Sequence, residues 1–256
     1  MTASFASMRP AWPPAISVPL RLVYGLYAAL LFLAVALVAL AGVLLLPTLA
    51  TRRGTARIAA RVFLFLSGMP LRIRGVANLP PGQCVVVANH ASYLDGVVMA
   101  AALPPRFGFV IKREMNDVPL AGLLLRRLGS EFVERFNRHK GGTDARRVLR
   151  TAASGHSLVF FPEGTFKPEV GVGKFHTGAF AIAAHAACPV VPAVIFGTRR
   201  NMPATRILPR PGPLEVRYSR PEMPAASGTG VDPAVELRDR VRTVILSEAG
   251  EPDLAA

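Results

Sequence analysis

The sequence predicts an α/β protein, with a mixed sheet flanked by helices and an N-terminal membrane-embedded helical segment. From residue 71 onward, short apolar runs alternate with stretches of helical periodicity, the pattern of a sheet with helices on its faces. Residues 22–50 contain no charged side chain, and as a helix this run is about 43 Å long, more than a bilayer's hydrocarbon thickness. We therefore expect a loose tail (1–20), a membrane-anchoring helical segment (21–70) and an α/β domain (71–256).

The tail and the membrane-anchoring segment are predicted from the positions of prolines, apolar residues and arginines. The tail contains four prolines and no apolar period. The apolar run is too long for a signal peptide's core, lacks a clear cleavage site, and is longer than core helices usually run without polar residues. Arginines crowd its far end, at 52, 53, 57 and 61, which by the positive-inside rule puts the rest of the chain at the cytoplasmic face of a membrane, the inner membrane in a bacterium.

A second apolar stretch, Val62–Met69, is too short to span a bilayer, and we expect it to lie at the interface. Hydropathy leaves two arrangements open. Either one spanning helix is followed by a surface helix, or two helices enter one leaflet without crossing it.

The predicted elements of the α/β domain follow its apolar patterns and its proline and glycine positions. The strands are Leu71–Gly75, Cys84–Ala88, Phe107–Ile111, Glu131–Phe136, Ser157–Phe161, Val190–Phe196 and Leu214–Tyr218. The helices are Gly96–Leu103, Val118–Leu128, Asp144–Ser154, Gly178–Ala187 and Val231–Ala249.

The formal net charge of +14 indicates a preference for anionic surfaces. Nucleic acid and anionic lipid both satisfy this preference, but we find no base-reading motif, so we expect anionic membrane lipids as partners and no nucleic acid. The two cysteines, Cys84 and Cys188, form no metal-binding spacing and are predicted to be reduced, structural thiols.

Polar residues follow the predicted strand Cys84–Ala88 directly. In open α/β sheets, ligands bind at the carboxyl ends of the strands. His90 and Asp95 are five residues apart, so a continuous helix would separate their side chains by about 140°. A strand-to-helix turn supplies the bend that brings them together. The Asp95 carboxylate then accepts from one imidazole nitrogen, while the other nitrogen faces a substrate hydroxyl.

Two further strand ends carry polar residues that we expect at the same edge of the sheet. Arg135 is suited to a phosphate because its donors match phosphate oxygens. Gly164 lets backbone amides approach an anion, and Glu163 offers a carboxylate to a hydroxyl or a basic group. The alternatives are an ordinary surface arginine and a turn selected for backbone reasons.

Four short blocks occur in order: Asn89-His90-x-Ser92-x-x-Asp95, Gly129 to Arg135, Phe161-Pro162-Glu163-Gly164-Thr165, and Val191-Pro192. They resemble the sequence blocks of the glycerolipid acyltransferase family, specifically its 1-acyl-sn-glycerol-3-phosphate acyltransferase branch. The resemblance covers roughly residues 71–198. It implies transfer of a fatty acyl group from coenzyme A or acyl carrier protein to the free hydroxyl of a lysophospholipid, lysophosphatidate in this branch, with no acyl-enzyme and no metal or other cofactor.

The resemblance also implies roles for individual residues. His90 would be the general base and Asp95 would orient it. Two departures from the family pattern are Lys167, in Phe166-Lys167 where many relatives have Arg or Ser, and His176, where many have Lys. The substrate-binding candidates are Asn89, Ser92, Arg135, Glu163, Gly164, Thr165, Lys167, Lys174 and His176, with Arg135 as the contact to the acceptor's phosphate.

Three alternative functions stay open. The acceptor could be another lysophospholipid or a lyso-aminolipid. A membrane-anchored anion-binding module without turnover fits the charge and the apolar segment, but leaves His90 and Asp95 unexplained. A serine hydrolase using Ser92 would need a Gly-x-Ser-x-Gly elbow, which the sequence lacks, and Ser92 is equally well explained as a helix cap.

Overall fold

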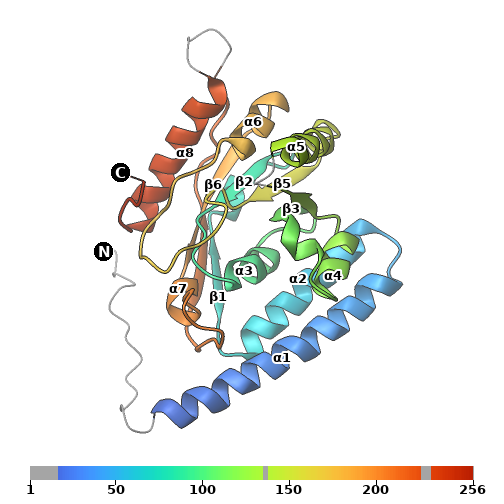
Figure 1. Ribbon diagram of the computed structural model, residues 1–256, viewed down its shortest axis with the longest axis vertical. Coiled ribbons are helices and arrows are strands. Elements are labelled where there is room, and N and C mark those ends of the chain that lie inside the picture. The colour runs from blue at the N-terminus through green and yellow to red at the C-terminus, as the bar shows by residue number, and fades with distance from the viewer. Residues whose placement is uncertain (1–16, 135–137, 226–231, 256) are drawn as a thin grey trace.

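A computed structural model describes residues 17–134, 138–225 and 232–255. It contains a seven-stranded sheet in the order β1-β7-β6-β2-β5-β3-β4 (Figure 1). Strands β6, β2, β5, β3 and β4 are parallel, and β7 runs antiparallel to β6 with β1 parallel to it. The predicted mixed sheet flanked by helices is therefore confirmed, and the carboxyl ends of five strands share one edge.

The strands lie where the apolar runs predicted them, and the ends that differ do so by one to three residues. The strands β6 (Val190–Phe196) and β7 (Leu214–Tyr218) have the predicted bounds. The others are β1 (Leu71–Arg74), β2 (Val85–Ala88), β3 (Phe107–Lys112), β4 (Glu131–Val133) and β5 (Ser157–Phe160).

The helices also follow the predicted order. Helix α4 begins at Ala121, three residues later than predicted, because the turn containing Pro119 and Leu120 (φ +59°) precedes it. The helices are α1 (Ser17–Leu45), α2 (Leu49–Leu66), α3 (Leu94–Ala102), α4 (Ala121–Arg127), α5 (Arg138–Ala153), α6 (Gly178–His185), α7 (Thr198–Asn201) and α8 (Pro233–Ala249), with 3₁₀ turns η2 (Val76–Asn78) and η3 (Arg113–Asn116).

The central strand β2 is buried on both faces, which explains its unbroken apolar sequence. Val86 belongs to a core that includes side chains of α2 and α3. Val85 and Val87 point to the opposite face, into a core completed by α5, α6 and α8. The sheet thus separates two layers of helices (Figure 1), and a rigid strand leads directly to the polar cluster.

Helices α1 and α2 form an antiparallel hairpin joined at Pro47. Tyr24 donates to the carbonyl of Ser67 (2.6 Å), near the amino end of α1, and Phe32 packs edge-on against Phe63 (5.3 Å between ring centroids). One stretch of α1, Val18–Leu45, is long and apolar enough to cross a bilayer, with a mean hydropathy of 2.9. The predicted tail (1–20) lies outside the described residues up to residue 16, and its last four residues are helical.

The stretch Val62–Met69, predicted to lie at the interface, forms the end of α2 and the turn that follows it. Most of it is the last part of α2, where Phe63 and Leu64 are buried in the core beside α3. Met69 follows the helix and is fully buried. Some apolar residues in this stretch are therefore buried in the core and others are exposed. Hydropathy does not distinguish the two groups.

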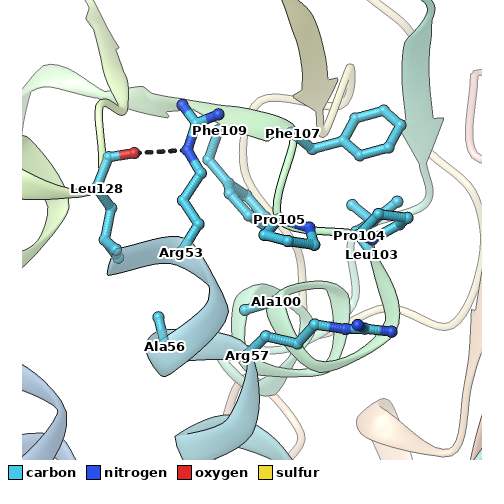
Figure 2. A pocket seen from close by; sticks show the side chains of 10 residues that line it. All are labelled: Arg53, Ala56, Arg57, Ala100, Leu103, Pro104, Pro105, Phe107, Phe109 and Leu128. Atoms are coloured by element: carbon cyan, nitrogen blue, oxygen red, sulfur yellow. Dashed lines mark hydrogen bonds between the residues drawn. The ribbon is translucent and has the colours of Figure 1, made fainter. Parts of the chain in front are cut away.

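Arginines of α2 attach it to the α/β domain. Arg53 donates through Nε to the carbonyl of Leu128 (2.9 Å) across a small pocket lined by α2, the end of α3 and the start of β3 (Figure 2). It also donates to the carbonyls of Arg106 and Gly129, and Arg61 donates to that of Ala101 (2.9 Å). These residues, which suggested membrane topology in the sequence, thus make structural hydrogen bonds.

Candidate active site

The ends of β2 and β5 bring the two most specific sequence blocks together. The two strands are neighbours, with Val87 opposite Phe160, so the segments that leave them begin side by side. His90 follows β2 by two residues and Glu163 follows β5 by three. Their contact is direct, because the backbone N–H of His90 donates to Oε1 of Glu163 (2.8 Å).

The predicted contact between His90 and Asp95 is confirmed. Nδ1 of His90 lies 2.9 Å from Oδ2 of Asp95, which sits in the first turn of α3. The same oxygen accepts from the backbone N–H groups of Ala91 (2.6 Å) and Ser92 (2.8 Å), so the carboxylate closes the turn that bends the chain back on itself. A carboxylate is also favoured at the amino end of a helix. With Nδ1–H donated to Asp95, Nε2 carries the lone pair that a general base needs.

Aromatic rings hold the imidazole in place. The ring of Phe161 stacks on that of His90 at 4.4 Å between centroids and an angle of 21°. Phe166 meets the imidazole edge-on at 4.8 Å and also contacts the exposed Tyr93. Sequence analysis assigned no role to Phe166 or Tyr93. Their signal in the sequence is weak, because aromatic side chains beside a strand end are usually core residues.

Glu163 binds backbone amides on both oxygens. Besides the contact to His90, Oε2 accepts from the N–H of Gly173 (2.8 Å). Burial raises the pKa of this carboxyl, and the two N–H donors counteract part of that increase. Each carboxylate oxygen of Glu163 thus accepts from one backbone N–H, which ties the segment after β5 to His90 and Gly173, and its predicted contact with the glycerol phosphate stays a prediction.

The side chains of Asn89 and Ser92 are likewise occupied by the backbone. Asn89 is paired with Ile195 of β6, whose N–H donates to Oδ1 (2.7 Å) and whose carbonyl accepts from Nδ2 (3.3 Å). Ser92 donates to the carbonyl of Met202 (2.6 Å) and accepts from the N–H of Leu94 (3.1 Å) at the start of α3. Both residues are buried. These hydrogen bonds position the turn, and the substrate-binding role of the two residues stays a prediction.

We expect Ser92→Ala to retain acyl transfer while lowering stability. The substitution leaves the Met202 carbonyl and the Leu94 amide without this buried partner, at a cost of about 1–3 kcal/mol. Thermal unfolding followed by circular dichroism, together with product assays below the transition, measures both effects. Loss of all catalysis with an unchanged Tm would instead indicate a nucleophilic serine.

The remaining predicted contacts lie on the loop between β5 and α6, apart from Arg135, which follows β4 in the sequence. Gly164 has φ +80°, a left-handed conformation that favours glycine, and its N–H closes a turn to the Phe161 carbonyl (3.0 Å). Arg135 lies outside the described residues, although Glu134 before it is described at the same edge of the sheet, after β4. Among the predicted contacts on this loop, Thr165, Lys167, Lys174 and His176 are exposed to solvent.

A family model described as Acyltransferase matches residues 70–196, the region from β1 to the end of β6 that contains His90, Asp95 and Glu163. This chain belongs to the acyltransferase family. The acyltransferase region therefore coincides with the part of the sheet whose strand ends form the site, and α1, α2, β7 and α8 lie outside it.

The curated relatives that this chain resembles are named 1-acyl-sn-glycerol-3-phosphate acyltransferases. The chain is 34% identical over 133 residues to the chloroplastic enzyme BAT2 of Brassica napus, covering 51% of this chain and 38% of the relative. It is 32% identical over 190 residues to the human enzyme alpha, covering 72% of this chain and 65% of the relative. The chain thus spans less than two thirds of the length of these relatives.

A solved structure has the same fold. The 1-acyl-sn-glycerophosphate acyltransferase PlsC of Thermotoga maritima superposes with a TM-score of 0.71 over 90% of this chain and 96% of that chain. The sequence identity is 24%. The superposed part of this chain therefore extends beyond residues 70–196 of the family match.

Proposed function

We propose that this acyltransferase is a 1-acyl-sn-glycerol-3-phosphate O-acyltransferase. It moves a fatty acyl group from acyl-CoA or acyl carrier protein to the free hydroxyl of 1-acyl-glycerol-3-phosphate, giving phosphatidate. The observation that carries the proposal is the His90–Asp95 pair at the strand edge, 2.9 Å apart and stacked against Phe161. The names of the curated relatives support the choice of reaction.

The proposed chemistry proceeds without an acyl-enzyme. Nε2 of His90 takes the proton of the acceptor hydroxyl as its oxygen attacks the thioester carbonyl carbon. The resulting oxyanion collapses and the carbon–sulfur bond breaks. The leaving thiolate then takes the proton from His90, which restores the neutral imidazole. Asp95 fixes the imidazole through Nδ1 and stabilises its positive charge during the reaction. No metal or resident cofactor is needed for these steps.

Positive side chains near the site suit the acceptor's phosphate. Lys167, Lys174 and His176 are exposed on the loop after β5, and we assign the principal phosphate contact to Arg135 after β4. Arginine donors match phosphate oxygens in pairs, whereas a lysine acts as a point charge. Another lysolipid with an anionic head group would meet the same side chains, which keeps it as the second candidate acceptor.

An assay of the products tests the reaction. Membranes containing the protein are incubated with lysophosphatidate and labelled oleoyl-CoA, and lipids are separated by chromatography. We expect labelled phosphatidate. Labelled free fatty acid as the sole product would favour hydrolysis, and no turnover with any acceptor of a lysolipid panel would favour a binding module. Parallel reactions with oleoyl-acyl carrier protein compare the two donors.

We also propose that α1 and α2 enter one leaflet from the cytoplasmic face. Near the amino end of α1, Gly25 packs against Leu208 of the α/β domain, and α1 also contacts α4, the helix that precedes the Leu128 carbonyl bound by Arg53. A helix of 29 residues, about 43 Å long, that contacts both Leu208 and α4 runs along the domain rather than away from it. This supports the second of the two arrangements left open by hydropathy.

Cysteine labelling in sealed vesicles, with the α/β domain outside, tests this arrangement. We expect Val18→Cys to react with a membrane-impermeant maleimide from the same side as Ser247→Cys, a control on the exposed surface of α8. The native Cys84 and Cys188 are buried, so they contribute little background. Labelling of residue 18 only after the vesicles are opened would indicate a single span.

A further inference from the structure

The loop between β5 and α6 is held from outside the acyltransferase region. It carries Phe166, which contacts the imidazole of His90, and the exposed side chains predicted to meet the acceptor. Its described backbone includes carbonyls that need partners when they are withdrawn from water. Two arginines far away in the sequence, Arg199 and Arg242, supply these partners.

Arg199, in the short helix α7, binds the first part of the loop. Its Nη1 donates to the carbonyls of Glu169 (2.6 Å) and Lys167 (3.4 Å), and its Nη2 to that of Gly171 (3.0 Å). Nη2 also binds Oε2 of Glu251 (3.2 Å), in the segment that follows α8. The side chain of Arg199 is only 17% exposed, and the two hydrogen bonds of its Nη2 group are partly buried.

Arg242, on α8, binds the second part of the loop. Its Nε donates to the carbonyl of Gly173 (3.1 Å) and its Nη2 to that of Val172 (3.3 Å). Both Nη groups bind the carboxylate of Asp253, with a distance of 2.8 Å from Nη1 to Oδ2. A two-pronged contact between guanidinium and carboxylate is geometrically specific as well as strong.

The segment after α8 also pairs directly with the loop. Val172 donates to the carbonyl of Pro252 (2.9 Å) and accepts from the N–H of Leu254 (3.0 Å), which forms an isolated parallel bridge. Gly171, at φ +149°, leaves room for Leu254, whose Cγ lies 2.5 Å from where a Cβ of residue 171 would be. The bridge therefore depends on a glycine at this position.

We propose that the segment Glu251–Leu254 is a positioning element of the acceptor site. Together with Arg199 and Arg242 it fixes the loop, and so sets both the contact of Phe166 with His90 and the placement of Thr165, Lys167 and their neighbours. The inference rests on the proposed acyl transfer at His90. These three parts of the chain lie beyond residue 196, so the acyltransferase region is completed by residues that its family model does not include.

Arg242→Met tests the proposal, with Arg240→Met as its control. Methionine keeps apolar contact with the ring of Phe175, over which Arg242 lies at 5.8 Å, but donates no hydrogen bond. Arg240 is on the same helix and binds Glu236 and Glu222 instead of the loop. In Arg242→Met we expect kcat/KM for lysophosphatidate to fall about ten- to a hundredfold, mainly through a higher KM, which is on the order expected for misplaced contacts. In Arg240→Met it should stay at the wild-type value.

Hydrogen exchange supplies a measurement that does not depend on activity. Amides in peptides covering residues 164–175 should exchange faster in Arg242→Met and in Asp253→Asn than in the wild type or Arg240→Met. Asp253→Asn keeps the arginine and serves if Arg242→Met does not fold. Wild-type kinetics and exchange in Asp253→Asn, or an equal loss in Arg240→Met, would overturn the proposal. If the wild type itself lacks acyl transfer, the proposed function fails while the exchange result still decides whether the segment fixes the loop.

Discussion

His90→Ala is expected to reduce phosphatidate synthesis by about 10³-fold, within the range contributed by general acid–base catalysis. The substitution removes the imidazole whose Nε2 would accept the proton of the acceptor hydroxyl. The protonated imidazole would then donate that proton to the leaving thiolate. Because the base accepts the proton in the transition state and not during substrate binding, the loss should appear in kcat, with a smaller change in KM for either substrate. Initial rates at saturating oleoyl-CoA and lysophosphatidate measure it.

Two control variants separate chemistry from folding. His156→Ala removes an exposed imidazole just before β5, at the other edge of the sheet, and should leave the rate unchanged. His90→Phe keeps an aromatic ring beside Phe161 and should be as inactive as His90→Ala, since ring stacking alone transfers no proton. A His90→Ala protein with intact activity would refute the assignment of His90 as the base.

Asp95→Asn and Asp95→Ala are expected to have different effects, because the carboxylate has two tasks. Asparagine retains one oxygen that can accept from Ala91 and Ser92 but has no negative charge for the imidazolium, so kcat should fall about 10²-fold or more while the fold persists. Alanine also leaves these two backbone amides without their buried acceptor, at a cost of about 1–3 kcal/mol each. Asp95→Ala should therefore be inactive and clearly less stable.

Kinetics and thermal unfolding of both variants, beside the exposed-surface variant Asp239→Asn on α8, measure the two effects. Asp239→Asn should match the wild type in rate and closely in Tm. A wild-type kcat in Asp95→Asn would remove the orienting role of the carboxylate. An unchanged Tm in Asp95→Ala would mean that the amides of the turn find other partners.

Several features of the site could be predicted because they are local. His90 and Asp95 are five residues apart at the end of an apolar strand, and a turn of that length can close on itself without help from distant residues. The bounds of β6 and β7 match the prediction because their apolar runs are flanked by proline or glycine. The backbone partners of Glu163 and Ser92 could not be predicted, because a polar residue in a sequence block does not indicate which backbone group it binds.

The chain's own sequence determined the class of fold, the length of the apolar N-terminal run and the contact between His90 and Asp95, since each of these follows from side chains close together in the chain. Only the tertiary structure decided that β5 lies beside β2, that arginines of α2 bind carbonyls of the α/β domain, and that Arg199 and Arg242 hold the loop over His90. The reason is physical. Backbone amides and carbonyls are the same at nearly every residue, so a side chain that binds them has no partner visible in the sequence until the chain is folded.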